Sequence, residues 1–269
     1  MLEKAILPLN LSESESDNKY LLAFLYELGS RHLHLAYVTD ANVGEASSRR
    51  RQLDRIATRA ADQGFQTQVD IRSGHAATAI CGLADQTGAG LIAFPWRKQD
   101  LMHRALFGSV AADVVRLSGH PVLIARKGLT DSPIHPLRTV LYATAFEMTD
   151  RQVMPYLRQP ELQAETLYLL HVAQRAPDPH AEELRQQRVQ QKLDVLAQEC
   201  ADQYQSVEQL AFIGSVRRQI IRQARKHDAD LIVIGKYDKG GPLRKMTGST
   251  AQHLVHRSPC SLLIIPKAV

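Results

Sequence analysis

Short apolar runs alternate along the chain with longer amphipathic segments. The runs are rich in Leu, Ile and Val and are bounded by Gly, Pro, Asp or Ser, which is typical of strands buried in a parallel sheet. The segments between them repeat apolar residues every three or four positions, as amphipathic helices do. In the first half the pattern predicts strands at 5–9, 32–38, 65–71, 91–96 and 122–125. It predicts helices at 21–28, 45–62, 76–87 and 109–117.

The same alternation starts again in the second half. Strands are predicted at 139–144, 167–172, 207–213, 231–234 and 262–265. Helices are predicted at 180–201 and 216–227, with a third ending near Arg257. Strands separated by helices form βαβ units, so the predicted fold class is α/β, with two tandem five-stranded parallel sheets of the Rossmann-like type.

The two halves are copies of one domain. Residues 128–137 contain Gly128, Pro133 and Pro136 and are predicted to link a domain at 1–127 to a domain at 138–269. Between positions 74 and 124, adding 140 to a position gives an identical residue in the second half at fourteen places. They are Gly74/Gly214, Ile80/Ile220, Ala84/Ala224, Ala89/Ala229, Leu91/Leu231, Ile92/Ile232, Arg104/Arg244, Gly108/Gly248, Ser109/Ser249, Ala111/Ala251, Val115/Val255, Ser118/Ser258, Leu123/Leu263 and Ile124/Ile264. Such a duplication predicts a pseudo-symmetric pair of domains packed together like a fused dimer.

A glycine-bearing basic loop follows the apolar run at 231–234. Gly235 ends the run, Gly240, Gly241 and Pro242 interrupt regular structure, and either hydroxyl of Ser249 or Thr250 can cap the next helix. Lys236, Lys239, Arg244 and Lys245 add positive charge to the positive end of that helix dipole. The loop suits an anion such as a nucleotide phosphate, although a crossover loop shaped only by its glycines gives the same pattern.

Composition and charge narrow the class of protein. The 269 residues are 44% hydrophobic and 23% charged, and no apolar run is long enough to predict a membrane span. The N-terminus lacks the basic segment and cleavage site of a signal peptide, so we expect a cytoplasmic protein. The net charge of +5 is spread over both halves, as +2 in residues 1–127 and +3 in residues 128–269.

Two clusters of basic residues lie in predicted helices, around Arg49–Arg51 and around Arg217–Arg218. The apolar positions of both helices face elsewhere, which favours a solvated helix face over a nucleic-acid interface. We therefore expect neither a nucleic acid nor a membrane as partner.

Other reactive residues do not form a recognisable constellation in the sequence. Cys81, Cys200 and Cys260 are far apart and predict buried or half-buried thiols rather than disulfides or a zinc site. His253 and His256 stand three apart on a predicted helix, but no third ligand is evident, which favours surface histidines. The sequence has no GxxxxGK[ST], GxSxG or HExxH motif, so no catalytic residues are predicted.

The duplicated pattern resembles two tandem universal stress protein domains across nearly the whole chain. In that family, fourth-strand glycines and a later Gly-Ser or Gly-Thr form the loop on which ATP-binding members lay the triphosphate. Gly235, Gly248 and Ser249 stand at the matching spacing, and Gly241 matches a further common glycine. The resemblance implies ATP or AMP in the second domain, with the adenine facing Val172. Its implied site residues are Val172, Gly235, Lys236, Gly241, Gly248, Ser249 and Thr250.

Several positions depart from the family pattern. Asp238 replaces the second glycine, and the strand-1 aspartate of nucleotide-binding members is matched by Asn10 and by Ala145. In the first domain, Pro95 and Lys98 replace the first two glycines, and proline offers no N–H to a phosphate. These departures predict that the first site is altered or lost. We expect Trp96, beside Pro95, to pack against protein rather than to stack on a base.

Three functions remain open at this point. The first is a non-catalytic stress-response module that binds ATP or AMP in its second domain. The second is an interaction or signalling protein that does not bind nucleotide, and the third is an enzyme acting on a nucleotide-activated substrate. The expected partner is the other domain of the same chain, and a homodimer of whole chains is a further option.

Overall fold

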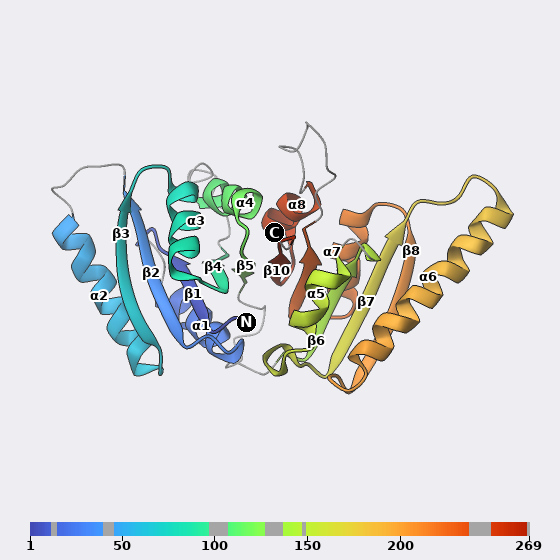
Figure 1. The fold of residues 1–269 in the computed structure, drawn as a ribbon, viewed down its shortest axis with the longest axis horizontal. Coiled ribbons are helices and arrows are strands. Elements are labelled where there is room, and N and C mark those ends of the chain that lie inside the picture. Colours follow the sequence, from blue (N-terminus) through green and yellow to red (C-terminus); the bar gives the residue numbers. More distant parts are fainter. Residues whose placement is uncertain are drawn as a thin grey trace. The chain divides into compact units, whose positions relative to one another are not determined.

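The chain forms two compact α/β units, here called unit 1 (Met1–Ile134) and unit 2 (His135–Val269). They are seen in a computed structural model that describes residues 1–11, 15–39, 46–96, 107–126, 137–146, 149–236 and 249–267. The predicted linker at 128–137 lies outside the described residues except for Leu137. Figure 1 labels the elements of each unit.

Unit 1 is a five-stranded parallel sheet in the order β3-β2-β1-β4-β5. Its elements are β1 (Lys4–Pro8), α1 (Glu15–Glu27), β2 (His32–Thr39), α2 (Ala46–Asp62), β3 (Gln66–Ser73), α3 (Ala76–Thr87), β4 (Leu91–Pro95), α4 (Phe107–Leu117) and β5 (Val122–Ala125). The inner strand β4 is buried at all of its positions, whereas the edge strand β3 has only half-buried and exposed positions. This difference explains why β4 is apolar throughout and β3 carries polar residues.

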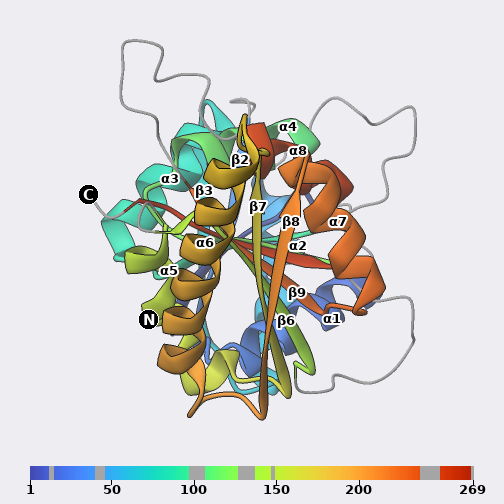
Figure 2. The same ribbon diagram turned by 90° about the vertical axis from the view of Figure 1, so that its right-hand side faces the viewer.

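Unit 2 repeats the arrangement, with its sheet in the order β8-β7-β6-β9-β10 and every described pair parallel. Its elements are β6 (Thr139–Thr144), α5 (Asp150–Leu157), the 3₁₀ helix η3 (Pro160–Leu162), β7 (Thr166–Ala173), α6 (Pro179–Cys200), β8 (Ser206–Ile213), α7 (Val216–Lys226), β9 (Leu231–Gly235), α8 (Ser249–Arg257) and β10 (Ser261–Ile265). Figure 2 shows α5 and α6 on one face of this sheet and α7 and α8 on the other. The predicted fold class, two tandem Rossmann-like units with parallel sheets, is confirmed.

Helix α5 was not predicted from the sequence. It is only eight residues long and contains Pro155, which breaks the helical signal in a short window. Its position after the first strand of unit 2 is the position of α1 in unit 1. The internal repeat therefore contained a signal for this helix that the local pattern lacked.

Candidate functional site

The strand order places a topological switch point in each unit. In unit 2, β6 lies between β7 and β9, so the chain winds one way from β6 to β8 and the other way from β9 to β10. Open parallel sheets bind ligands beyond the carboxyl ends of the strands at such a point. The candidate site of unit 2 is therefore the end of β6 with the adjoining ends of β7 and β9.

The predicted site residues that the structure describes lie near the carboxyl ends of strands or in the first turn of α8. They are Val172 in β7, Gly235 at the end of β9, Lys236 directly after it, and Ser249 and Thr250 in α8. Gly241 and Gly248, and with them Asp238, lie outside the described residues. The described part of α8 begins at Ser249, and Ser249 and Thr250 are its first two residues.

Gly235 permits a close approach of α5 to the end of β9. A Cβ atom at this position would lie 2.5 Å from the Cβ of Thr149 and 3.1 Å from Cγ2 of Val153. Both contacts are shorter than real Cβ atoms tolerate comfortably, and Thr149 precedes the first turn of α5. The first glycine of the loop is thus required by packing within unit 2, whatever the loop binds.

The backbone of Lys236 takes part in the fold. Its N–H donates to the carbonyl of Ile265 at 2.7 Å, and its own carbonyl accepts from Nε2 of Gln152 at 3.3 Å. The N–H is therefore already used by β10, and only the side chain of Lys236 can contribute to binding an anion.

Asp150 places a carboxylate at the carboxyl end of β6. Tyr142 Oη and Thr144 Oγ1 each donate to its Oδ1 at 2.6 Å. Within the described part of the chain, no hydrogen bond reaches the other carboxylate oxygen, Oδ2. Burial raises the pKa of Tyr142 far above its ordinary value, and the charge of Asp150 raises it further, so the phenol remains a donor. Asp150 therefore keeps one oxygen available at the switch point.

Sequence reasoning missed Asp150 because it looked for the strand-1 aspartate at Ala145. The side chain of Ala145 has no polar group, and its N–H donates to Thr149 Oγ1 at 3.2 Å. The undetected helix α5 brings Asp150 back to the strand end five residues later. The Thr149-Asp150 pair before an apolar segment was the available signal, since both residue types favour helix starts.

An aromatic stack covers the adjoining ends of β6 and β7. The buried ring of Phe146 stacks on His171 with 4.1 Å between ring centroids, and Lys192 Nζ lies 5.3 Å from the Phe146 ring centre. Phe146 has a φ of 57°, a left-handed conformation that costs a non-glycine residue about 1 kcal/mol or more. His171 Nδ1 donates to the carbonyl of Thr144 at 3.2 Å. The stack lies one residue before Val172, the position that the family resemblance assigns to the adenine.

Unit 1 differs at the equivalent point. Pro95 ends β4, and the N–H of Trp96 donates to the carbonyl of Ala125 at 2.6 Å. The guanidinium of Arg126 lies 3.7 Å from the centre of the Trp96 ring. One face of the indole is thus covered by a protein cation, in line with the prediction that Trp96 packs against protein. Asn10 lies just beyond β1 and is half-buried.

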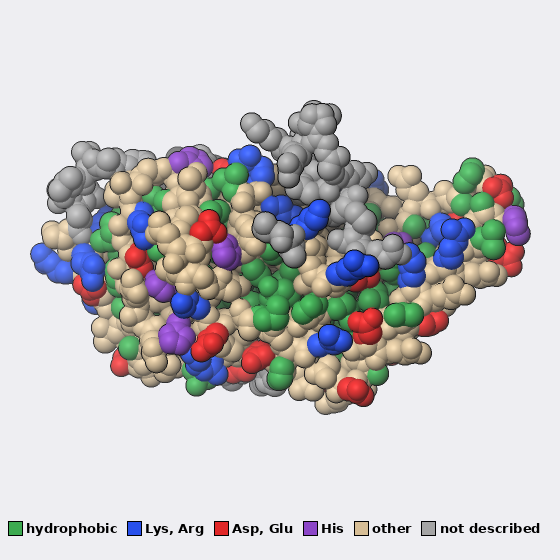
Figure 3. All heavy atoms as spheres, viewed as in Figure 1, with side chains coloured by type: hydrophobic (Ala, Val, Ile, Leu, Met, Phe, Trp, Pro, Cys, Tyr) green, Lys and Arg blue, Asp and Glu red, His purple; other side chains and the backbone are tan. Residues whose placement is uncertain are grey.

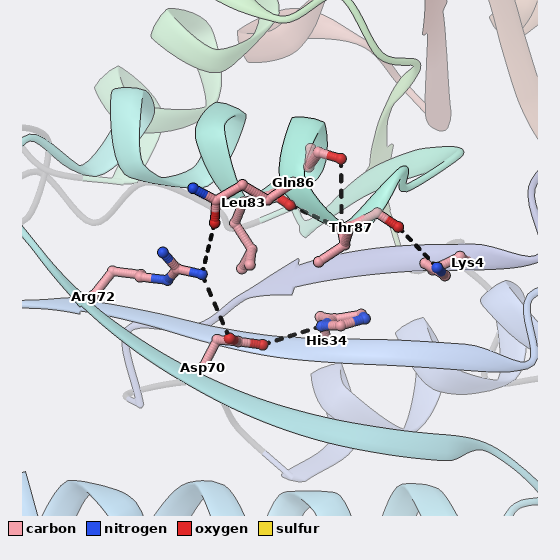
Figure 4. A network of polar contacts seen from close by, with 8 residues as sticks. Lys4, His34, Asp70, Arg72, Leu83, Gln86 and Thr87 are labelled. Carbon is pink, nitrogen blue, oxygen red and sulfur yellow. Dashed lines mark hydrogen bonds and ion pairs between the residues drawn. The ribbon is translucent and has the colours of Figure 1, made fainter.

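Figure 4 shows a polar network inside unit 1 that holds two strands against a helix. His34 Nδ1 on β2 lies 3.1 Å from Asp70 Oδ2 on β3, and both side chains are largely buried. Arg72 approaches Asp70 at 3.8 Å and donates to the Gln86 side chain of α3 at 3.0 Å. Lys4 Nζ donates to the carbonyl of Thr87 at 2.8 Å. Apart from the Arg72–Asp70 contact within β3, these contacts link different elements of the fold.

Thiols and histidines form no further centre in the residues that the structure covers. Cys200 is buried and Cys81 and Cys260 are half-buried, which is the burial predicted for these thiols. Burial raises the pKa of Cys200 to about 12, so it stays protonated. No group of three or more His, Cys, Asp or Glu residues in that covered part could hold a metal ion. None of its helices combines the length and apolar character of a membrane span.

These features define a class: tandem Rossmann-like α/β units with a switch-point site and a glycine at the end of the fourth strand. The family model of universal stress proteins matches the chain twice, over residues 13–126 and 137–266. The chain therefore belongs to the universal stress protein family and is of the tandem type.

Solved structures with the same fold cover nearly the whole chain. A universal stress protein from Archaeoglobus fulgidus DSM 4304 is 20% identical, with a TM-score of 0.74, over 98% of this chain and 96% of its own. A functionally unknown protein from Pseudomonas aeruginosa PAO1 is 15% identical, with a TM-score of 0.72, over 99% and 93%. A putative universal stress protein from P. aeruginosa UCBPP-PA14 is 16% identical, with a TM-score of 0.69, over 99% and 94%. The comparison with curated proteins finds no match.

Proposed function

We propose that this tandem universal stress protein is a non-catalytic module that binds ATP or AMP in unit 2. The observation that carries the proposal is the carboxylate of Asp150 at the switch point, with Oδ2 open to a ligand. A carboxylate oxygen accepts hydrogen bonds from ribose hydroxyls, which is how Rossmann-like sites hold the nucleoside. Asp150 thus supplies the acceptor that Ala145 lacks.

The phosphates would lie toward the start of α8. Free N–H groups and the positive end of the helix dipole meet an anion there, and the Lys236 side chain adds a cation from the end of β9. The sequence spacing from Gly235 to Gly248 and Ser249 supports this arrangement through the family resemblance. In the proposed complex, Val172 faces the base and Thr250 lies beside the phosphates.

The location and the pairing of the units are part of the same proposal. Three cysteines that lie far apart in the sequence and in no CxxC pair favour a reducing compartment such as the cytoplasm. The internal duplication favours pairing of the two units within one chain, as two copies of a single-domain relative would pair.

Titration calorimetry of the purified full chain with ATP and with AMP tests nucleotide binding. Wild-type protein should bind one of them, and Asp150→Asn should weaken binding about tenfold, since a charged acceptor is replaced by a neutral one. The asparagine Oδ1 can still accept from Tyr142 and Thr144, so the fold should be kept. No heat at millimolar nucleotide, together with no nucleotide in the mass spectrum of the protein as purified, would exclude the proposal.

A second function, interaction or signalling without a nucleotide, is favoured by the Phe146–His171 stack. The stack covers the adjoining ends of β6 and β7, which border the candidate site. Phe146→Ala distinguishes the two functions, because it removes the ring without touching Asp150. If the stack excludes nucleotide, ATP should bind the Phe146→Ala variant and not the wild type.

A further inference from the structure

Helix α7 of unit 2 carries a concentrated positive charge that its duplicate in unit 1 lacks. Five of its eleven residues are exposed cations, here called the α7 basic face: Arg217, Arg218, Arg222, Arg225 and Lys226. The equivalent residues of α3 are Ala77, Thr78, Gly82, Asp85 and Gln86. The two helices therefore differ by six charges, from +5 on these positions of α7 to −1 on those of α3 (5 − (−1) = 6).

The fold does not require these cations. Ile80 and Ala84 are buried in unit 1, and the equivalent Ile220 and Ala224 are buried in unit 2. Each helix packs through that apolar face, α3 against α4 and α7 against α8. The duplicate shows that the same packing is achieved with no cation on the outer face.

Some cations of α7 oppose the stability of their own helix, although Arg225 and Lys226 in its last turn suit the helix dipole. Within the described part of the chain, none of the five side chains forms a hydrogen bond or an ion pair. Arg218 and Arg222 are four residues apart, as are Arg222 and Lys226, a spacing at which like charges destabilise a helix. Arg217 and Arg218 lie at the amino end, where the helix dipole disfavours cations.

Helix α2 is a basic helix in which some arginines have partners within the same unit. It also carries five arginines, but Arg50 forms an ion pair with Asp54 at 3.0 Å. The guanidinium of Arg49 lies 5.9 Å from the ring centre of Tyr37. Along α6, Figure 3 shows basic and acidic side chains interspersed. Helix α7 differs from both in having only one sign of charge and no partners among the described residues.

Two exposed apolar residues adjoin the start of the α7 basic face. Ile213 ends β8 and Val216 begins α7, and each is 41% exposed. The equivalent residues of unit 1 are the small Ser73 and Ala76. Unit 2 has therefore gained apolar surface and positive charge in the same place.

We propose that the α7 basic face, with Ile213 and Val216 at its start, binds an acidic protein segment that also carries apolar side chains. Carboxylates pair with the arginine guanidinium groups, which match them in geometry, and apolar side chains cover the two exposed aliphatic residues. This site lies on the face of the unit 2 sheet opposite α5 (Figure 2) and does not depend on nucleotide binding.

Other anionic partners fit less well. The phosphate backbone of a nucleic acid has no group that would cover Ile213 and Val216, and α7 itself has no aromatic side chain on which a base could stack. Membrane-binding helices insert a continuous apolar face, whereas the apolar face of α7, with Ile220 and Ala224, is buried in the unit.

Fluorescence anisotropy with the full chain tests the proposal. The probe is a fluorescein-labelled peptide of alternating Glu and Leu, and a Glu-Ser peptide, a DNA duplex and phosphatidylserine vesicles are run in parallel. Wild-type protein should bind the Glu-Leu peptide best, with an affinity that falls as salt rises. Reversing two charges in Arg218→Glu/Arg222→Glu should weaken binding at least about tenfold.

A matched control distinguishes binding at the α7 basic face from a general effect of net charge. Arg51→Glu/Arg55→Glu reverses two exposed arginines with the same spacing on α2 and changes the net charge equally, so binding should stay within about twofold. Ile213→Ser/Val216→Ala restores the unit 1 residues and should weaken binding about fivefold. Equal losses in the two arginine variants, no peptide binding at low salt, or preferential binding of the duplex or the vesicles would each overturn the proposal.

Discussion

Gly235 has a clear structural role at the scale of single residues. Its missing Cβ lets Thr149 approach the end of β9. We predict that Gly235→Ala lowers the free energy of unfolding by about 1–3 kcal/mol, because a Cβ would overlap the Thr149 side chain. Urea denaturation followed by circular dichroism measures the change.

Gly82 provides the matched control for Gly235. It lies inside α3, and a Cβ there would meet no atom within 4 Å. Gly82→Ala should therefore stabilise the protein by about 0.5–1 kcal/mol through helix propensity. If Gly235→Ala were as well tolerated as Gly82→Ala, the packing role of Gly235 would be wrong.

His171 should make unit 2 sensitive to acid. Burial lowers its pKa below the ordinary 6.5, and the nearby cations Arg185 and Lys192 act in the same direction. The unfolded chain then binds this proton more readily than the folded chain, so stability falls as the pH drops below about 6.5.

The prediction is tested by comparing wild type with His171→Gln at roughly pH 7.5 and pH 5.5. Circular dichroism in urea should show a smaller loss of unfolding free energy on acidification in the variant. Equal losses in both proteins would show that His171 is not the group responsible.

At the scale of elements, the His34–Asp70 contact joins β2 to β3 in unit 1. The side chains are only 11% and 14% exposed, so an unpaired partner would be left in a largely dry site. We predict that Asp70→Ala lowers the free energy of unfolding of unit 1 by about 1–3 kcal/mol.

Trp96, the single tryptophan of the chain, lies in unit 1 and reports on that unit alone. In the Asp70→Ala variant, the unfolding transition followed by Trp96 fluorescence should therefore have its midpoint at a lower urea concentration. Asp70→Asn keeps the size of the side chain and one acceptor oxygen, so it should lower the free energy of unfolding less than Asp70→Ala does. A midpoint unchanged in both variants would contradict the structural role of the network.

At the scale of the whole molecule, the two units have kept one fold and diverged at their switch points. Unit 2 has Gly235 and the carboxylate of Asp150, whereas unit 1 has Pro95 and a tryptophan covered by Arg126. We therefore predict that nucleotide binds with a stoichiometry of one per chain. Calorimetry measures it, and two equal sites per chain would contradict the divergence.

Much of the fold could be predicted because it depends on local patterns. The apolar runs of β4 and β9, the amphipathic periodicity of α2 and the turn glycines are short-range features. The duplication could be recognised from the sequence because identical residues recur at one constant spacing. Helix α5 was missed because Pro155 weakens the helical pattern of the local sequence. The helix forms nevertheless, because its packing against β9 outweighs the low helix propensity of the segment.

By itself, the sequence determined the number of units, their parallel sheets and the position of the glycine loop, since each follows from periodicity and spacing. Only the tertiary structure decided what surrounds the end of β6. Asp150 reaches Thr144, Phe146 stacks on His171 and Gly235 admits Thr149 because separate elements pack together. Contacts between residues distant in the sequence depend on how whole elements pack, and a local sequence pattern does not predict that packing.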